Sequence, residues 1–276
     1  MSNEATVEKH YTHGSLINAI AAGVRAMGKT TASVTLDDLA PVDEFHIGGR
    51  RATQEFLDQL SIAAGKTVLD VGCGLGGASR FAAAQYGSTV TGIDLTGEYI
   101  ETGQELCRWV GLDRHISLHQ GSALAMPFDS ESFDAAYMLH VGMNIADKAA
   151  LAREVHRVLK PGGVFGVYDV MLTGDTPLQY PVPWAATPEA NAVAPPPAYK
   201  AALEAAGFAI AGERNRRDFA LAFFGEMRAK MAGAGGPPPL GIHILMGNDT
   251  PTKVANMIAN ITAGTIAPVE IVARKA

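Results

Sequence analysis

The feature that most constrains this chain is a glycine-rich stretch, TVLDVGCGLGG, at residues 67–77. Its first five residues form a short apolar run that is typical of a buried strand. Gly72, Gly74 and Gly77 follow the G-x-G-x-x-G spacing that joins a strand to a helix in dinucleotide-binding folds. Glycine lets the backbone approach a ligand closely, because no Cβ stands in the way. The stretch therefore predicts a strand, a ligand-binding loop and a helix in succession.

Strands and helices are expected to alternate from this stretch onward. Apolar runs predict strands, and apolar residues at helical spacing predict the helices between them. The predicted strands are 67–71, 88–95, 115–121, 133–141, 163–170, 208–213 and 269–276, and the predicted helices are 76–87, 97–110, 147–159, 198–206, 217–232 and 251–263. This rhythm indicates an α/β fold, a Rossmann-like, doubly wound, mostly parallel seven-stranded sheet.

Two parts of the chain fall outside this alternation. Residues 1–64 are expected to form an N-terminal helical or lid segment, with helices at 14–28 and 50–62. Residues 65–276 would be the ligand-binding domain, with insertions at about 171–197 and 214–266. Long loops in compact domains are often functional, so the insertions either cap a substrate or only cover sheet edges. The sequence leaves both alternatives open.

Composition narrows the class of protein. The chain has 276 residues, 47% of them hydrophobic and 18% charged, as in a globular protein. Its formal net charge of -6 argues against general nucleic-acid binding, which favours a basic face. Cys73 and Cys107 make neither a disulfide framework nor a metal motif. No apolar run suits a membrane span, and the start, MSNEATVEKH, lacks a signal-peptide core, so we expect a cytoplasmic protein.

Two carboxylates bear on which adenosine-containing ligand the glycine loop holds. Asp94 lies 22 residues after Gly72, where an acid can accept hydrogen bonds from the ribose of NAD or of S-adenosylmethionine. Asp70 ends the first strand, where a carboxylate would repel a pyrophosphate but attract the cationic end of the methyl donor. None of the seven tyrosines is followed by lysine four residues later, which disfavours a short-chain dehydrogenase.

Four motifs together carry a family resemblance. VLDVGCGLGG, GIDL, GSALAMPFDSESFDAAYMLHV and LKPGG resemble, in order and spacing, the motifs of the class I S-adenosylmethionine-dependent methyltransferases. The resemblance covers roughly residues 65–170. The flanking segments are similar in style to the small-molecule branch, which includes the ubiquinone-type C-methyltransferases and the glycine, sarcosine and dimethylglycine N-methyltransferases.

The resemblance implies a role for each matching residue. Four residues, Asp70, Gly72, Cys73 and Gly74, would surround the amino-acid end of the donor. Asp94 would hold the ribose and Leu95 would pack on the adenine face, while Ser122 and Ala123 would lie at the adenine edge. His140 would lie where donor and substrate meet. Ser122 departs from the pattern, since the family often has an aspartate there that accepts a hydrogen bond from the adenine amino group. The neutral serine can still accept one, or the contact passes to a neighbour.

Catalysis requires a base only if the acceptor atom starts protonated. The candidate catalytic residues are His140, His46 and Tyr11, with Asn144 beside them. Each of the three also has a purely structural interpretation. His140 could be a strand-end histidine that only packs, His46 could belong to a turn that enters a helix, and Tyr11 could be a surface residue. Trp184 either holds a cationic amine by cation–π attraction or pins the insertion to the core. His115 and His119 share a strand face without a third ligand, so no metal is expected.

These observations predict an S-adenosylmethionine-dependent methyltransferase that acts on a small molecule, with an amine nitrogen as the first choice of acceptor. The alternatives are a C- or O-methyltransferase of a ring-containing metabolite and a non-catalytic S-adenosylmethionine-binding protein. S-adenosyl-L-methionine is the expected cofactor. We expect no nucleic-acid or membrane partner, and a homodimer is compatible with the sequence.

Overall fold

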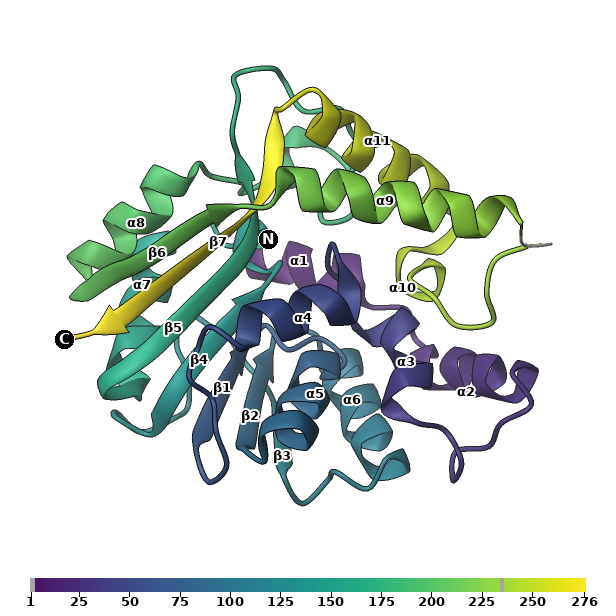
Figure 1. Ribbon diagram of the computed structural model, residues 1–276, viewed down its shortest axis with the longest axis horizontal. Helices are drawn as coiled ribbons and strands as arrows, with labels where there is room; N and C mark the ends of the chain where they lie inside the picture. Colours follow the sequence, from purple (N-terminus) through teal and green to yellow (C-terminus); the bar gives the residue numbers. More distant parts are fainter. Residues whose placement is uncertain (1–2, 234–235) are drawn as a thin grey trace.

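In the computed structural model, which describes residues 3–233 and 236–276, seven strands form one sheet in the order β3-β2-β1-β4-β5-β7-β6 (Figure 1). Strands β1 to β5 run parallel, and β7 runs antiparallel to both of its neighbours. The predicted Rossmann-like, mostly parallel sheet is therefore confirmed. The strands are β1 (Thr67–Val71), β2 (Thr89–Asp94), β3 (Ile116–Gln120), β4 (Phe133–Leu139), β5 (Leu159–Leu172), β6 (Phe208–Asn215) and β7 (Ile266–Lys275).

Helices cover both faces of the sheet, because neighbouring strand residues point to opposite sides. Val68 of β1 belongs to the apolar cluster beneath α4 (Gly49–Leu57), α5 (Gly77–Tyr86) and α6 (Gly97–Trp109). Leu69 belongs to the cluster beneath α7 (Lys148–Val158) and α8 (Pro196–Ala205) on the other face. Burial on both faces explains why the central strands are continuous apolar runs.

Local signals place several of the helix ends. The carboxylate of Asp147 accepts a hydrogen bond from the Ala150 N–H at 2.8 Å and so caps the N-terminus of α7. Gly87 ends α5 in the left-handed conformation at φ 67°. Gly162, near the start of β5, takes a φ of 75°, which favours glycine. These ends are determined by residues close to them in sequence.

The N-terminal segment contains more helix than the sequence predicted. Besides α2 (Leu16–Ala26) and α4, it forms α1 (Asn3–Tyr11) and α3 (Leu36–Asp43). Residues 44–48 join α3 to α4. Helix α3 contains Pro41, which hides it from a propensity argument, although Thr35 and Asp38 form a capping box at its start. That box was the signal available in the sequence.

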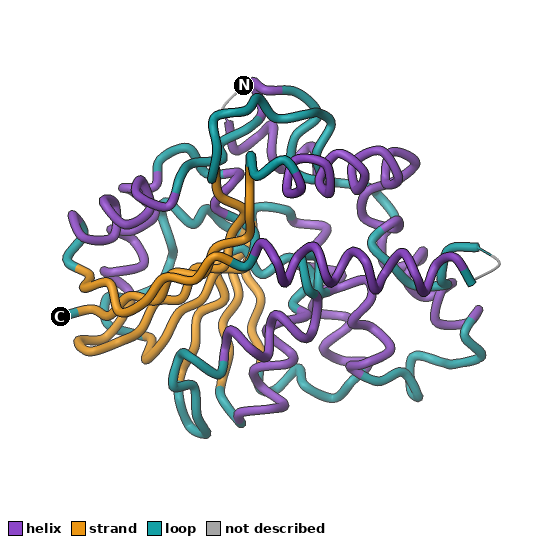
Figure 2. Tube along the Cα trace, turned by 45° about the horizontal axis from the view of Figure 1, so that its top comes forward, coloured by secondary structure: helices purple, strands orange, loops and turns teal. Residues whose placement is uncertain are grey.

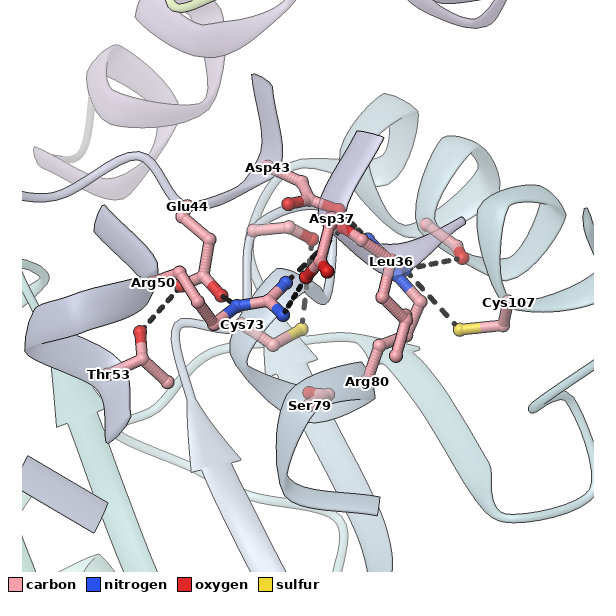
Figure 3. A network of polar contacts seen from close by, with 12 residues as sticks. Leu36, Asp37, Asp43, Glu44, Arg50, Thr53, Cys73, Ser79, Arg80 and Cys107 are labelled. Atoms are coloured by element: carbon pink, nitrogen blue, oxygen red, sulfur yellow. Dashed lines mark hydrogen bonds and ion pairs between the residues drawn. The ribbon is translucent and has the colours of Figure 1, made fainter. Parts of the chain in front are cut away.

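Two adjacent acids at the end of α3 bind it to the rest of the molecule (Figure 3). Arg80 of α5 forms an ion pair with Asp43 at 2.5 Å, and the two side chains are 0% and 1% exposed. Glu44 accepts hydrogen bonds from Arg50 Nε at 2.5 Å and Thr53 Oγ1 at 2.6 Å, both on α4. The pairs join α3 to α4 and α5, so this part of the N-terminal segment is integral to the fold.

A helical cap follows the sheet's sixth strand. Helix α9 (Arg217–Ala232) continues outward from β6 beyond the strand ends, and α10 (His243–Met246) and α11 (Thr250–Thr262) return the chain to β7 (Figure 2). Phe224 of α9 and Met257 of α11 pack in one buried cluster with Trp184. Across the described residues, no helix has both the length and the apolar character that a bilayer crossing requires.

Candidate functional site

A cavity of about 1990 Å³ lies at the carboxyl ends of the parallel strands and extends beneath the cap. Open parallel sheets bind ligands at this edge. Pockets for single small molecules usually measure roughly 300–1,000 Å³, so this cavity has room for two ligands. The strand-end residues that line it include Asp70, Gly72, Asp94 and His140, and the cap residues include Phe224 and Met257.

The three glycines of the fingerprint do different things. Gly72 and Gly74 line the cavity with φ of 73° and 53°, a backbone conformation that favours glycine. A Cβ on Gly72 would also lie 2.4 Å from a methyl group of Val141. A Cβ on Gly77 would instead lie 2.4 Å from the carbonyl oxygen of Asp43. Gly77 therefore lets α3 approach α5, a packing role that the pattern itself did not reveal.

Asp70 is a buried carboxylate on the cavity wall, with 2% of the residue exposed. Its Oδ2 accepts hydrogen bonds from Ser79 Oγ at 2.6 Å and from the Tyr137 hydroxyl at 3.0 Å. Burial raises the pKa of Asp70 to about 7, and the two hydrogen bonds partly oppose that rise. A cationic ligand group nearby would favour the ionised form.

Asp94 organises the loop that it faces. Its Oδ2 accepts from the Gly74 N–H and its Oδ1 from the Thr96 N–H, both at 2.9 Å. Burial raises the pKa of Asp94, while these N–H groups lower it. Cys73 and Leu95 line the same part of the cavity. Burial raises the pKa of the Cys73 thiol, so it stays uncharged there.

The loop after β3 is the part of the predicted donor site that the sequence described least well. Ala123 lines the cavity, whereas Ser122 is not among the described lining residues. The Ser122 hydroxyl donates to the Glu4 carboxylate of α1 and accepts from the Leu124 N–H at 3.0 Å. Glu4 itself lines the cavity. A carboxylate from the N-terminal helix thus stands beside the position where the family often has an aspartate.

His140 follows β4 in a strained conformation. Its φ is 55°, which is uncommon outside glycine and asparagine, and the residue is 9% exposed. Among the residues described, its Nε2 has no hydrogen-bond partner. Burial, with a smaller effect of nearby His46, lowers the pKa of His140 well below the usual value. Strained backbone and unpartnered buried polar atoms are features that cluster at functional sites, which keeps His140 a candidate.

His46 lies next to His140, although 94 residues separate them in the chain. Their ring centroids are 5.9 Å apart, and the Tyr168 ring lies 5.0 Å from His140. His46 Nε2 is 3.0 Å from Thr53 Oγ1 and 3.2 Å from the Gly49 carbonyl oxygen. Burial lowers the pKa of His46 as well. The fold therefore brings two buried imidazoles to one part of the cavity, where burial favours the neutral form of each.

Tyr11 closes the same cavity from the end of α1. Its hydroxyl accepts a hydrogen bond from Asn144 Nδ2 at 3.4 Å, and its ring lies 5.9 Å from that of Tyr99. Burial raises the pKa of Tyr11, so the phenol remains protonated. The predicted candidates Tyr11 and Asn144 are thus neighbours on the cavity wall.

Trp184 lines the cavity but is mainly engaged in packing. The residue is 2% exposed, and its Nε1 donates to Asn191 Oδ1 at 2.8 Å. These contacts support the reading in which Trp184 pins the insertion to the core. Within residues 3–233 and 236–276, no three His, Cys, Asp or Glu side chains are grouped so that they could hold a metal ion.

Comparison with known proteins relates this geometry to a family. Residues 69–167 match the family described as "Methyltransferase domain". Methyltransferase GfsG of Streptomyces halstedii is 31% identical over 137 residues, which cover 50% of this chain and 49% of that protein. Cycloartenol-C-24-methyltransferase of Arabidopsis thaliana is 39% identical over 115 residues, 42% of this chain and 34% of that protein. The chain thus matches about half or less of the length of these relatives.

A solved structure shows the same fold along the whole chain. The geranyl diphosphate C-methyltransferase from Streptomyces coelicolor A3(2), in complex with Mg²⁺, geranyl diphosphate and S-adenosyl-L-homocysteine, superimposes with a TM-score of 0.69. The superposition covers 100% of this chain and 98% of that one, at 18% sequence identity. At this level of identity the likeness speaks for the architecture alone.

Proposed function

Residues 69–167 match the family described as "Methyltransferase domain", and we propose that this protein is an S-adenosylmethionine-dependent methyltransferase that methylates a carbon atom of a bulky, largely apolar small molecule. The observation that carries the proposal is the cavity of about 1990 Å³, which joins a polar donor end to an apolar end under the cap. The sequence favoured an amine nitrogen. Relatives named as C-methyltransferases, such as the Arabidopsis thaliana protein, favour the carbon alternative instead.

The donor end fits S-adenosylmethionine residue by residue. Asp70 would attract the ammonium group, the loop of Gly72 and Gly74 would pass close to the amino-acid end, and Asp94 would accept from the ribose hydroxyls. The fit rests on two features of this chain: a buried carboxylate beside the loop, and the positive φ of Gly72 and Gly74 on the cavity wall, which favours glycine. When bound, S-adenosylmethionine supplies an activated methyl group on a sulfonium.

The acceptor end is suited to an apolar molecule. The cap lines it with Phe223, Phe224, Met227, Leu245, Val254 and Met257. Burial of apolar surface contributes about 25 cal/mol per Å², so such a wall binds a hydrocarbon body and excludes water. Methionine adapts its shape to irregular ligands. Correct alignment of two bound reactants can contribute on the order of 7–11 kcal/mol toward the barrier.

His140 and His46 are the residues we propose for proton handling. Both side chains are buried, and burial keeps both imidazoles neutral. A neutral imidazole offers one nitrogen lone pair, which can accept a proton from an acceptor carbon or hydroxyl. His140 has the free Nε2, and His46 is held by Thr53 and Gly49. We therefore assign the direct role to His140 and the orienting role to His46, with Tyr11 a neutral wall of the same site.

To test this function, the protein is incubated with labelled S-adenosylmethionine and, in separate reactions, with an organic-soluble and an aqueous metabolite fraction, and the transfer of label is measured. We expect label in an organic-soluble product, with the new methyl group on carbon in its NMR spectrum. An N-methylated amine as the product would contradict the acceptor assignment. Tight binding of S-adenosylmethionine without transfer to either fraction would favour the non-catalytic alternative.

The role of His140 is tested by His140→Asn, because asparagine tolerates the positive φ that most residues avoid. We expect turnover to fall by about 10²–10⁴-fold, the range for loss of a positioned acid or base, with little change in donor affinity. His119→Asn is the matched control, since His119 is an exposed histidine on β3. Wild-type turnover in His140→Asn would remove this residue from the mechanism.

A further inference from the structure

We propose that Glu4, on the N-terminal helix α1, is the residue that distinguishes the adenine of the methyl donor from other bases. The inference rests on the proposed function, because it concerns how this chain binds S-adenosylmethionine. It adds a specificity residue from a segment that lies outside the matched region 69–167.

The carboxylate of Glu4 lies on the loop that follows β3. Its Oε1 accepts a hydrogen bond from the Ser122 hydroxyl, and Ser122 Oγ in turn accepts from the Leu124 N–H. Glu4 lines the cavity together with Gly121, Ala123 and Leu124. An ionised carboxylate offers about four lone-pair sites, so Glu4 can accept from a ligand while it holds Ser122.

The order of the strands indicates that the base lies at this loop. Asp70 ends β1 and would take the cationic end of the donor, and Asp94 ends the next strand, β2, and would take the ribose. Strand β3 is the neighbour of β2 on the side away from β1. A ligand laid along these strand ends places its base at residues 121–124, where Leu95 also lines the cavity.

Helix α1 is held over this corner by contacts along its length. Glu8 Oε1 accepts from Gln120 Nε2 at 3.3 Å, next to the β3 loop. At the other end of the helix, His10 Nε2 lies 3.0 Å from the Pro183 carbonyl oxygen. After the helix, Glu98 accepts from the backbone N–H groups of Gly14 and Leu16 at 2.8 and 2.9 Å. The position of Glu4 is therefore set by the tertiary structure of the helix as well as by Ser122.

The chemistry of a carboxylate selects adenine. The exocyclic amine of adenine donates hydrogen bonds, whereas hypoxanthine presents a carbonyl oxygen at the same place. An ionised carboxylate only accepts, so it would bind the amine and repel the carbonyl. Ser122 cannot make this distinction alone, because a hydroxyl both donates and accepts. Glu4 thus supplies the acceptor that an aspartate at position 122 would otherwise provide.

Calorimetric binding of two ligands tests the assignment: S-adenosylhomocysteine and S-inosylhomocysteine, which differ only in the base. We expect wild type to prefer the adenosyl ligand by about 10–100-fold, the range for a hydrogen bond to a charged group. Glu4→Gln should reduce that preference to about threefold or less, since the amide can donate to the carbonyl of hypoxanthine. Ser122→Ala, which frees Glu4 from its anchor, should reduce the preference in part.

Glu101→Gln is the matched control, because Glu101 is an exposed acid on α6 that does not line the cavity, and this variant should keep the wild-type preference. Equal loss of affinity for both ligands in Glu4→Gln would show a merely structural role and overturn the assignment. An unchanged preference would overturn it as well, while leaving the proposed function intact. Failure of wild type to bind either ligand would instead overturn the proposed function, and the Glu4 assignment with it.

Discussion

The proposed donor end and the proposed acceptor end of the cavity are built in contrasting ways. At the donor end, Asp70, Gly72, Gly74 and Asp94 lie within 25 residues of one another in the chain, on the ends of adjacent strands. At the acceptor end, the lining comes from segments as far apart as His46 and Met257. A ligand common to a whole family can be served by a short motif. The binding site for a ligand that is specific to one protein can instead be lined by segments that are distant in sequence and that the fold brings together.

The polar groups of the two ends differ as well. At the donor end the carboxylates of Asp70 and Asp94 each accept hydrogen bonds from protein donors, so their positions are set before a ligand arrives. At the acceptor end His140 Nε2 lacks a partner among the described residues, and the surroundings are mostly apolar. Under the proposed function, the donor site is therefore organised before binding, and the acceptor site is completed by its ligand.

The largest effect on the free energy of unfolding is expected from loss of the buried Arg80–Asp43 ion pair, which joins α5 to α3. Arg80→Met leaves Asp43 buried without its cation, and should lower the free energy of unfolding by about 3–5 kcal/mol. Arg108→Met is the control, because Arg108 is 55% exposed in its pair with Glu105, and such pairs contribute about 1 kcal/mol or less. Urea denaturation measures both. Equal effects of the two substitutions would contradict the importance of the buried pair.

A smaller effect is expected for donor affinity. Asp94→Ala removes the proposed ribose acceptor and the partner of the Gly74 N–H, and should weaken S-adenosylhomocysteine binding by about 1.5–3 kcal/mol. Calorimetry measures it, with circular dichroism to establish that the variant folds. Asp113→Ala, at an exposed position, serves as the control. An unchanged dissociation constant in folded Asp94→Ala would mean that the ribose binds elsewhere.

The raised pKa of Asp70, about 7, predicts that donor affinity depends on pH. Below that value the carboxyl is protonated in the free protein, and a cationic group favours its ionised form. Affinity should therefore rise between about pH 5.5 and 7.5, by at most about tenfold per pH unit. The same raised pKa means that the folded state binds more protons than the unfolded state in this window, so this group's contribution to stability falls as pH rises.

Calorimetry of Asp70→Asn and Asp169→Asn separates this effect from other titrations. The asparagine at position 70 should flatten the pH dependence of donor affinity. The pKa of Asp169 is also raised to about 7 by burial, but its Oδ2 accepts from the Tyr199 hydroxyl, away from the proposed donor contacts. Asp169→Asn should therefore preserve the slope. The reverse result would assign the titration to Asp169.

The smallest effect is expected at Trp184, on the acceptor side. Trp184→Phe loses the hydrogen bond to Asn191 and should lower the free energy of unfolding by about 1 kcal/mol. Turnover and donor affinity should stay near wild type. A drop in turnover at unchanged stability would place the indole against the acceptor and would revive the cation–π interpretation.

The sequence predicted the central strands and helices better than the N-terminal segment. Residues 69–167, which contain GIDL and LKPGG and most of VLDVGCGLGG, match the family described as "Methyltransferase domain", and the alternation of elements predicted the mostly parallel sheet. Helices α1 and α3 were missed. Helix α1 has few apolar residues to show a period, and Pro41 masks α3, whose capping box at Thr35 was the better guide. The roles of individual site residues remain predictions.

By itself, the sequence determined what depends on neighbouring residues: the strand, loop and helix around Gly72, the cap of α7 at Asp147, and the carboxylate at the end of each of the first two strands. Only the tertiary structure places His46 beside His140, packs α3 closely against Gly77 of α5, and brings Glu4 within hydrogen-bond distance of Ser122. The physical reason is that backbone conformation and capping hydrogen bonds are encoded locally. Contacts between distant segments depend on how entire helices and strands pack, which no short pattern contains.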